Sequence, residues 1–320
     1  MIQHAYQEFV IRQLDDWRTE GWDVCLVTVV QIDGGSPRPL GSQMAVRADG
    51  LTIGLVTGGC AEKAIVGEAQ LALREGAVRQ TRFGAGSPYV DVRLPCGTGL
   101  DLRFDPNPDQ ALIRQILTER KARRPITLVM ERPAGVLSLA EGLPYGSRPC
   151  HSDSQALIRP YTAPVRLVLA GRGPLTDVLA RLALDTGIEV FVQTPDEDVA
   201  AALTDTGAEI AALTSPADFD HGLLDAATAL VLLFHDHEWE PDILTHALAS
   251  EAFYIGALGS RSTHAQRLEI LRSNGVSDEG VERIRGPVGL TIGAEGPIEI
   301  AVSVLGDVIA ARRQAGLAPL

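Results

Sequence analysis

Two cysteines in short glycine-rich stretches are the residues of this sequence best suited to covalent or metal chemistry. Cys60 stands in TGGCAE (57–62), and Cys96 stands in LPCGTG (94–99). A thiolate is both a nucleophile and a soft metal ligand, and the first turn of a helix favours it, whereas a nearby carboxylate such as Glu62 disfavours it. Because most buried cysteines are inert, a structural role for both residues stays open.

The surroundings of these cysteines complete no familiar catalytic or zinc-binding pattern. The four cysteines (Cys25, Cys60, Cys96 and Cys150) lie far apart and form no CxxC pair, which argues against a zinc ribbon and against a disulfide framework. We therefore expect free thiols in a reducing cytoplasm. No His or Asp stands at a spacing that identifies a catalytic triad, so a hydrolase is not favoured.

A glycine-containing turn in the second half of the chain has the context of an anion site. The continuous apolar run VRLVLAG (165–171) predicts a buried parallel strand, and Gly171-Arg172-Gly173 then leads into a helix. Amide groups at a helix start, together with the helix dipole, favour a phosphate. Arg172 would add a charge-assisted contact. A tight turn without a ligand is the alternative.

The same segment lacks the complete dinucleotide fingerprint. Thr176 stands where the third glycine is expected, and the next strand ends in Thr194-Pro195, which puts Asp196 late and behind a proline. The pattern therefore argues against NAD(P) but leaves a phosphate-bearing ligand open.

Further polar or glycine-rich segments follow strands expected in the same sheet. His235 and Asp236 follow ALVLLF, and Gly259, Ser260 and Arg261 follow FYIGAL. Ligands of open α/β sheets bind at the carboxyl ends of the strands, so these residues are candidates for a binding site. The two histidines His235 and His237, with Asp236, would suit a metal or form only a hydrogen-bonded turn. Ser260 is expected to cap a helix.

The elements that must position these residues indicate an α/β protein of two domains. Residues 1–135 predict a mixed α/β domain, and the Pro-, Gly- and Ser-rich stretch 136–163 predicts a linker. Strands and helices alternate over 164–320, which predicts a Rossmann-like, doubly wound parallel sheet.

Composition excludes several classes of partner. The chain has 320 residues, 45% apolar residues and a formal charge of −13. An acidic protein is not expected to bind nucleic acid or a membrane surface without specific contacts. The sequence contains no apolar run of membrane-spanning length and no signal-peptide pattern, so a cytoplasmic protein is expected.

Several long motifs together resemble one family. They are GGSPRPLGSQMAV, GGCAE, LPCGTG, FHDHEWEPD, YIGALGSRSTHAQR and GPVGLTIGAEGPIEIAVSVL. The combination is similar to the XdhC/CoxI family of xanthine dehydrogenase accessory factors, over nearly the whole chain. Residues that match the family motifs are Ser36, Pro37, Arg38, Gly58, Gly59, Cys60, Glu62, Cys96, Gly171, Gly173, His235, Asp236, Asp242, Gly256, Gly259, Ser260 and Arg261.

The resemblance implies a chaperone that binds the molybdenum cofactor, a molybdopterin that sometimes carries a nucleotide. Such a protein protects the cofactor during sulfuration and inserts it into a xanthine or aldehyde dehydrogenase. It implies a homodimer, a cysteine desulfurase or sulfurtransferase as a second partner, and contact of Cys60 and Cys96 with molybdenum. The family's usual glycine loop, GAGHxA, is replaced here by Gly171-Arg172-Gly173-Pro174-Leu175-Thr176.

Two other functions remain as alternatives from the sequence. One is an NAD(P)-dependent oxidoreductase that uses the Rossmann-like domain. The other is an interaction protein that docks a sulfurtransferase on the molybdoenzyme and binds no cofactor.

Overall fold

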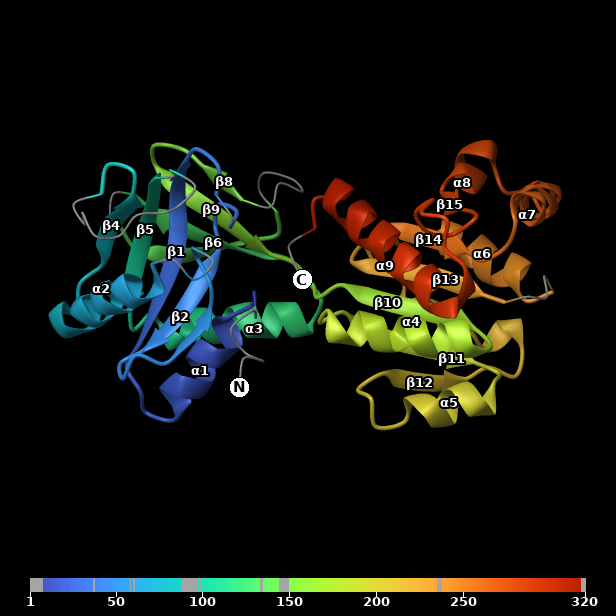
Figure 1. The fold of residues 1–320 in the computed structure, drawn as a ribbon, viewed down its shortest axis with the longest axis horizontal. Helices are drawn as coiled ribbons and strands as arrows, with labels where there is room; N and C mark the ends of the chain where they lie inside the picture. The colour runs from blue at the N-terminus through green and yellow to red at the C-terminus, as the bar shows by residue number, and fades with distance from the viewer. Residues whose placement is uncertain are drawn as a thin grey trace. The chain divides into compact units, whose positions relative to one another are not determined.

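The computed structural model of the chain describes most of its length as two compact units. The described residues are 8–36, 38–57, 59, 61–87, 97, 99–132, 135–143, 150–234 and 238–317. The chain divides after Ala163 into an N-terminal unit and a C-terminal unit that begins at Pro164 (Figure 1).

The first sheet of the N-terminal unit is antiparallel and has the strand order β3-β2-β1-β5-β4. Its strands are β1 (Val24–Asp33), β2 (Gln43–Arg47), β3 (Thr52–Gly54), β4 (Arg79–Gly84) and β5 (Gly99–Pro106). Successive residues of β1 point to opposite faces, so Cys25 and Val27 pack in one core while Val24 and Leu26 pack in another.

Helices cover both faces of this sheet. Helix α2 (Glu62–Glu75) contributes Ile65 and Ala69 to the core on one face. Helices α1 (Ile11–Thr19) and α3 (Gln110–Lys121) contribute to the core on the other face. The mixed α/β domain predicted from the sequence is thus observed.

A second antiparallel sheet replaces the predicted linker. Its strand order is β7-β6-β9-β8. Its strands are β6 (Ile126–Glu131), β7 (Leu137–Glu141), β8 (His151–Ser152) and β9 (Ala156–Tyr161). The prediction of a linker over 136–163 is wrong because Leu157 and Tyr161 enter the same core as α1 and α3. The strands are short and joined by turn-forming residues, which dominated the sequence pattern.

The C-terminal unit is a Rossmann-type domain, as predicted. Its six-stranded parallel sheet has the order β12-β11-β10-β13-β14-β15. The strands are β10 (Arg166–Gly171), β11 (Glu189–Thr194), β12 (Glu209–Ala212), β13 (Thr228–Leu233), β14 (Tyr254–Ala257) and β15 (Ile284–Arg285). The helices are α4 (Pro174–Asp185), α5 (Glu197–Leu203), α6 (Glu240–Leu248), α7 (Arg261–Ser273), α8 (Asp278–Glu282) and α9 (Gly296–Gln314).

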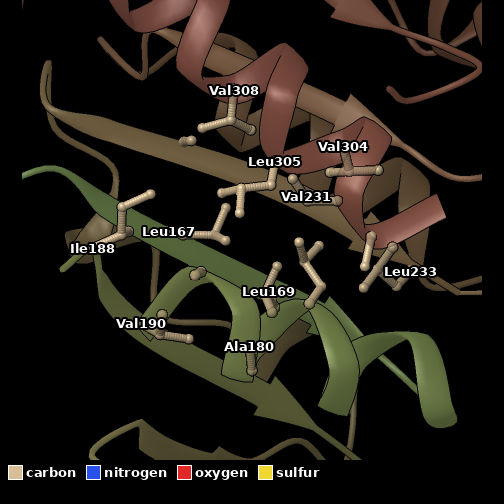
Figure 2. Packing of buried hydrophobic residues seen from close by; sticks show 14 of the residues in the cluster. Leu167, Leu169, Ala180, Ile188, Val190, Val231, Leu233, Val304, Leu305 and Val308 are labelled. Carbon is tan, nitrogen blue, oxygen red and sulfur yellow. The ribbon is translucent and has the colours of Figure 1, made fainter. Parts of the chain in front are cut away.

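Both faces of the parallel sheet are buried, which explains its continuous apolar strands. Figure 2 shows Leu167 and Leu169 of β10 with Val304 and Val308 of α9 in the core on one face. Val168 of β10 belongs to the core on the opposite face, which α6, α7 and α8 cover. In the described part of the chain, no helix has the length and apolar character to cross a membrane.

Candidate functional site

The glycine turn after β10 is shaped first by strand packing. A Cβ atom at position 171 would lie 2.5 Å from the Cβ of Leu233 on the neighbouring strand β13. Gly171 is therefore required by the contact between two strands, whatever the turn binds. Gly173 has φ +75° and precedes α4, with Pro174 at the first helical position.

Asp196 reaches this turn, although the sequence predicts that Pro195 displaces it. The amide of Gly173 donates to Oδ2 of Asp196 at 3.0 Å. The hydroxyl of Thr194 donates to the carbonyl of Gly171 at 2.7 Å and accepts from the amide of Asp196 at 3.0 Å, so it folds the strand end back onto the turn.

The hydrogen bonds to Asp196 favour its ionised form. Besides the Gly173 amide, the amides of Val199 and Asp198 at the start of α5 donate to its carboxylate. The amide of Gly173, followed by that of Val199, lowers the pKa of Asp196. A carboxylate thus already occupies one amide of the predicted anion site, and a phosphate there would have to displace it.

Arg172 lies beside the segment that follows β13. Its guanidinium carbon is 5.3 Å from the ring centroid of Trp239, and that ring stacks on Phe234 with centroids 5.5 Å apart. The predicted candidates His235 and Asp236 lie outside the described residues. The matched residue Asp242 is exposed in the first turn of α6.

The loop after β14 contains the predicted helix cap. Ser260 precedes α7, and its hydroxyl accepts from the amide of Thr263 at 3.2 Å. Gly259 has φ +140°, and a Cβ atom there would lie 2.7 Å from Cγ2 of Thr263. Arg261 begins α7 and is exposed. Gly256 packs against Val288, because its Cβ atom would lie 2.6 Å from Cγ2 of that residue.

A buried ion pair that the sequence does not predict holds this loop. Nε and Nη2 of Arg267 donate to the two carboxylate oxygens of Glu240 at 2.8 and 3.0 Å, and the two side chains are 3% and 2% exposed. Nη2 also donates to the carbonyl of Leu258 at 2.6 Å. We call this set the Arg267 brace. Twenty-seven residues separate its charged partners, so only the packing of α6 against α7 brings them together.

A cleft of about 350 Å³ opens at the same edge of the parallel sheet. It lies between the starts of α4 and α9 and the loop after β14. Its lining is mostly apolar, with Arg172 as a charged contributor. The lining residues are Arg172, Pro174, Leu175, Leu258, Gly259, Gly296, Pro297 and Ile300. The sequence analysis did not identify the apolar lining residues, because only the neighbouring glycines indicated loops that could bind a ligand.

In the N-terminal unit, Glu62 bonds to the loop that precedes it. Its Oε1 accepts from the hydroxyl of Thr57 at 2.7 Å and from the amide of Gly59 at 2.9 Å. Its Oε2 accepts from the amide of Ala61 at 3.0 Å. We call these contacts the Glu62 clamp. The neighbouring candidates Gly58 and Cys60 lie outside the described residues.

Strand pairing places the residue before the GGSPRPLGSQMAV motif and the last residue of the LPCGTG motif at one edge of the first sheet. Asp33 at the end of β1 is opposite Gly99 at the start of β5, which is opposite Gly84 at the end of β4. Arg82 of β4 links the three strands at this edge. Its guanidinium donates to Asp33 of β1 at 2.5 Å and to Asp101 of β5 at 3.2 Å.

The loop after β1 carries Arg38. Its Nη1 donates to Glu8 at 3.2 Å, and its amide donates to the hydroxyl of Ser36 at 3.3 Å. Pro37 and the predicted cysteine Cys96 lie outside the described residues.

The two cysteines that the structure describes are free thiols with unreactive surroundings. Burial raises the pKa of Cys25 well above its ordinary value, and the charge of Asp105 adds to that effect. Burial also raises the pKa of Cys150 to about 11. Among the residues that the structure describes, no group of three or more His, Cys, Asp or Glu side chains is arranged to hold a metal ion.

The architecture defines a class of protein: a two-unit α/β protein with a Rossmann-type domain, which carries a cleft at one edge of its sheet. Sequence comparison then gives the family. The family model described as "XdhC Rossmann domain" matches residues 167–308 of this chain. The model described as "XdhC and CoxI family" matches residues 17–84. The chain belongs to the XdhC/CoxI family, as its motifs predict.

Two curated relatives resemble the chain over most of its length. The molybdenum cofactor insertion chaperone PaoD of Escherichia coli K12 is 34% identical over 302 residues, which cover 91% of this chain and 84% of PaoD. A Bacillus subtilis 168 protein, described as a probable xanthine dehydrogenase component, is 27% identical over 328 residues, covering 91% of this chain and 94% of that protein.

A solved structure supports the fold. A crystal structure described as a xanthine dehydrogenase from Bacillus halodurans matches with a TM-score of 0.77 and 22% identity, covering 95% of this chain and 96% of the other. The match includes residues of both units, and at this identity it concerns the fold alone.

Proposed function

We propose that this protein is a chaperone of the molybdenum cofactor, which binds the cofactor, protects it during sulfuration and inserts it into a molybdoenzyme of the xanthine or aldehyde dehydrogenase type. The observation that carries the proposal is the 34% identity to a molybdenum cofactor insertion chaperone over 84% of that protein's length. We infer an accessory factor rather than an enzyme with its own turnover.

The Glu62 clamp supports this role in the N-terminal unit. The carboxylate fixes the amides of Gly59 and Ala61, which are the sequence neighbours of Cys60. Thiolates are soft ligands and suit molybdenum, so Cys60 and Cys96 are the proposed contacts to the metal. Because Glu62 is bonded to its own loop, we assign it a positioning role rather than direct contact with an anionic cargo.

The C-terminal unit, taken by itself, carries its own candidate region for cofactor binding. The cleft offers apolar walls to the planar part of the cargo, and Arg172 offers a positive charge at its border. Gly259, Ser260 and Arg261 lie on the loop that the Arg267 brace holds at this cleft.

The proposed partners follow from the same role. They are the recipient molybdoenzyme and a cysteine desulfurase or sulfurtransferase that supplies the terminal sulfur. We place the protein in the cytoplasm, where the cofactor is handed over, and propose that it acts as a homodimer.

A loading experiment tests the proposal. Molybdenum cofactor released from a donor enzyme is mixed anaerobically with the purified protein, and retained molybdenum and pterin are measured after desalting. We expect nearly one cofactor per chain and its transfer to an apo-molybdoenzyme. Cys60→Ala and Cys96→Ala should lower retention, whereas Cys150→Ser should not, because that half-buried thiol has a raised pKa and stays protonated.

Retention no greater than that of an unrelated control protein would contradict the chaperone function. Full retention by both motif-cysteine variants would contradict only the proposed thiol contacts.

A further inference from the structure

Exposed apolar side chains gather on helix α9 and on the loop before it. The described part of the chain has eight large apolar side chains that are exposed, and four of them lie between positions 290 and 302. These four are Leu290, Ile292, Ile298 and Val302. Single exposed apolar residues are normal on a protein surface, whereas a group of them marks a surface that another molecule covers.

The outward side of α9 is apolar because of the helical repeat. Val304 and Val308 pack against the parallel sheet in Figure 2. Ile298 and Val302 lie one turn apart on the side that faces away from it, and they are 67% and 51% exposed. With 3.6 residues per turn, positions 306, 309 and 313 continue this side to the end of the helix.

Leu290 extends the same surface from the preceding loop. Its amide donates to the carbonyl of Ser303 at 3.1 Å, which holds the loop against the helix. A Cβ atom at Gly306 would lie 3.0 Å from Cδ1 of Leu290, so the leucine side chain lies over that glycine. We call Leu290, Ile298, Val302 and Gly306 the α9 face.

Opposite charges lie at the two ends of the α9 face. Glu299 is in the first turn of α9, Arg313 is in the last turn, and both are exposed. Oε2 of Glu299 accepts from the amide of Glu295 at 2.7 Å, so the carboxylate is held at the helix start. The two charges are about 21 Å apart along the helix axis and point to the same side, at 1.5 Å and 100° per residue.

This spacing matches a second copy of α9 that runs antiparallel. Gly306 lies midway between Glu299 and Arg313, so a two-fold axis there puts each carboxylate opposite the guanidinium of the other copy. The same axis puts Val302 opposite Ala310 and brings the two Leu290 side chains beside the axis. A two-fold contact therefore satisfies both charges and covers the apolar residues between them.

We propose that the α9 face is the surface through which two copies of this chain associate, with the α9 helices antiparallel and two ion pairs between Glu299 and Arg313 at the rim. The inference rests on the homodimer of the proposed function and assigns its interface. Pro297 and Ile300 of the same helix line the cleft, so the contact also holds one wall of the cleft in place.

Sedimentation equilibrium of the full-length protein tests the apolar part of the interface. We expect the wild type to be a dimer at micromolar concentration. Val302→Glu places a charge at the centre of the contact and should weaken association at least about tenfold. Ile270→Glu is the matched control, because it changes an exposed apolar residue of α7 in the same unit and should leave association unchanged.

Exchange of the two charges tests the antiparallel arrangement. Glu299→Lys and Arg313→Glu should each weaken association about tenfold, because two attractive pairs become repulsive. An equimolar mixture of the two variants should associate as tightly as the wild type, since both contacts then join opposite charges. Glu299→Lys also loses the bond to the Glu295 amide, but the mixture retains that loss and thus separates it from the effect on the interface.

The possible results distinguish this inference from the proposed function. A dimer that Val302→Glu leaves intact, or a mixture no tighter than the separate variants, would overturn the α9 interface alone. A wild type that stays monomeric at every concentration would overturn both the interface and the proposed homodimer. Dimerisation with all the expected effects, in a protein that retains no cofactor, would support the interface and contradict the chaperone function.

Discussion

At the scale of single residues, two carboxylates organise the loops that carry the family motifs. Glu62 accepts three hydrogen bonds from the loop before α2, and Asp196 accepts from the glycine turn and from α5. Neither geometry follows from residue spacing alone. Each carboxylate accepts three hydrogen bonds from nearby loop or helix-start residues, so its first task is to fix a loop.

We expect Glu62→Gln to loosen the loop at 57–61. Glutamine keeps one acceptor oxygen, but its amide group would face another donor, so one hydrogen bond is lost at a cost of about 1–2 kcal/mol. Hydrogen exchange of the Gly59 and Ala61 amides should accelerate, and cofactor retention should fall. Asp16→Asn, which changes an exposed carboxylate of α1, is the control. Unchanged exchange at both amides would contradict the Glu62 clamp.

At the scale of elements, the Arg267 brace joins three segments that are separate in sequence. It links the first residue of α6, the middle of α7 and the loop after β14. Buried ion pairs add little stability compared with apolar residues, but removing one partner leaves a buried charge. The brace therefore serves to place the Leu258 carbonyl, and with it one wall of the cleft.

Arg267→Met should destabilise the C-terminal unit by about 3–5 kcal/mol, because Glu240 remains buried without its main partner. Adding Glu240→Gln should recover part of this loss, which a double-mutant cycle in urea unfolding would measure. Arg272→Met, one turn further along α7 and exposed, is the control. If Arg267→Met and Arg272→Met lower the free energy of unfolding by the same amount, the brace does not stabilise the C-terminal unit.

The strands show how far the sequence predicts elements. The predicted strands at 165–171 and 229–235 correspond to β10 and β13, because burial on both faces makes these strands apolar along their length. The strand at 137–141 was missed because it is only partly buried and lacks an apolar run. The burial of this strand depends on its neighbours in the folded sheet, so the local sequence pattern does not predict it.

The candidate site shows a similar division. Ser260 was predicted as a helix cap because the cap depends on adjacent residues. The position of Asp196 was not predicted because the Thr194 hydroxyl turns the chain back towards Gly171. The pairing of Arg267 with Glu240 needs the packing of two helices, so it lies beyond any sequence motif.

At the scale of the whole molecule, two histidines make the C-terminal unit sensitive to acid. Burial, followed by repulsion from His246, lowers the pKa of His221, and Asp220 opposes the shift. Burial, followed by repulsion from Arg267, lowers the pKa of His264, and Glu240 opposes the shift. The unfolded chain then binds more protons than the folded chain near pH 6, so stability falls as the pH falls.

We expect the melting temperature of the C-terminal unit to decrease from pH 7.5 to pH 5.5, with most of the loss below the ordinary histidine pKa of about 6.5. His221→Gln and His264→Gln should each reduce this dependence, because glutamine does not titrate. His151→Gln in the N-terminal unit is the control. Thermal unfolding across the pH range measures how the melting temperature changes with pH. The same pH dependence in both test variants as in the wild type would contradict the role assigned to the two histidines.

The raised pKa values of the two described thiols have a practical consequence for labelling chemistry. Cys25 and Cys150 hold their protons at neutral pH because burial raises the pKa of both. Alkylating reagents and peroxide attack the thiolate, so these two positions give little background signal. We therefore expect rapid modification of the native protein at pH 7–8 to occur at Cys60 or Cys96. Wild-type protein can then report protection of the motif cysteines by a bound cargo, with no need to remove the other two.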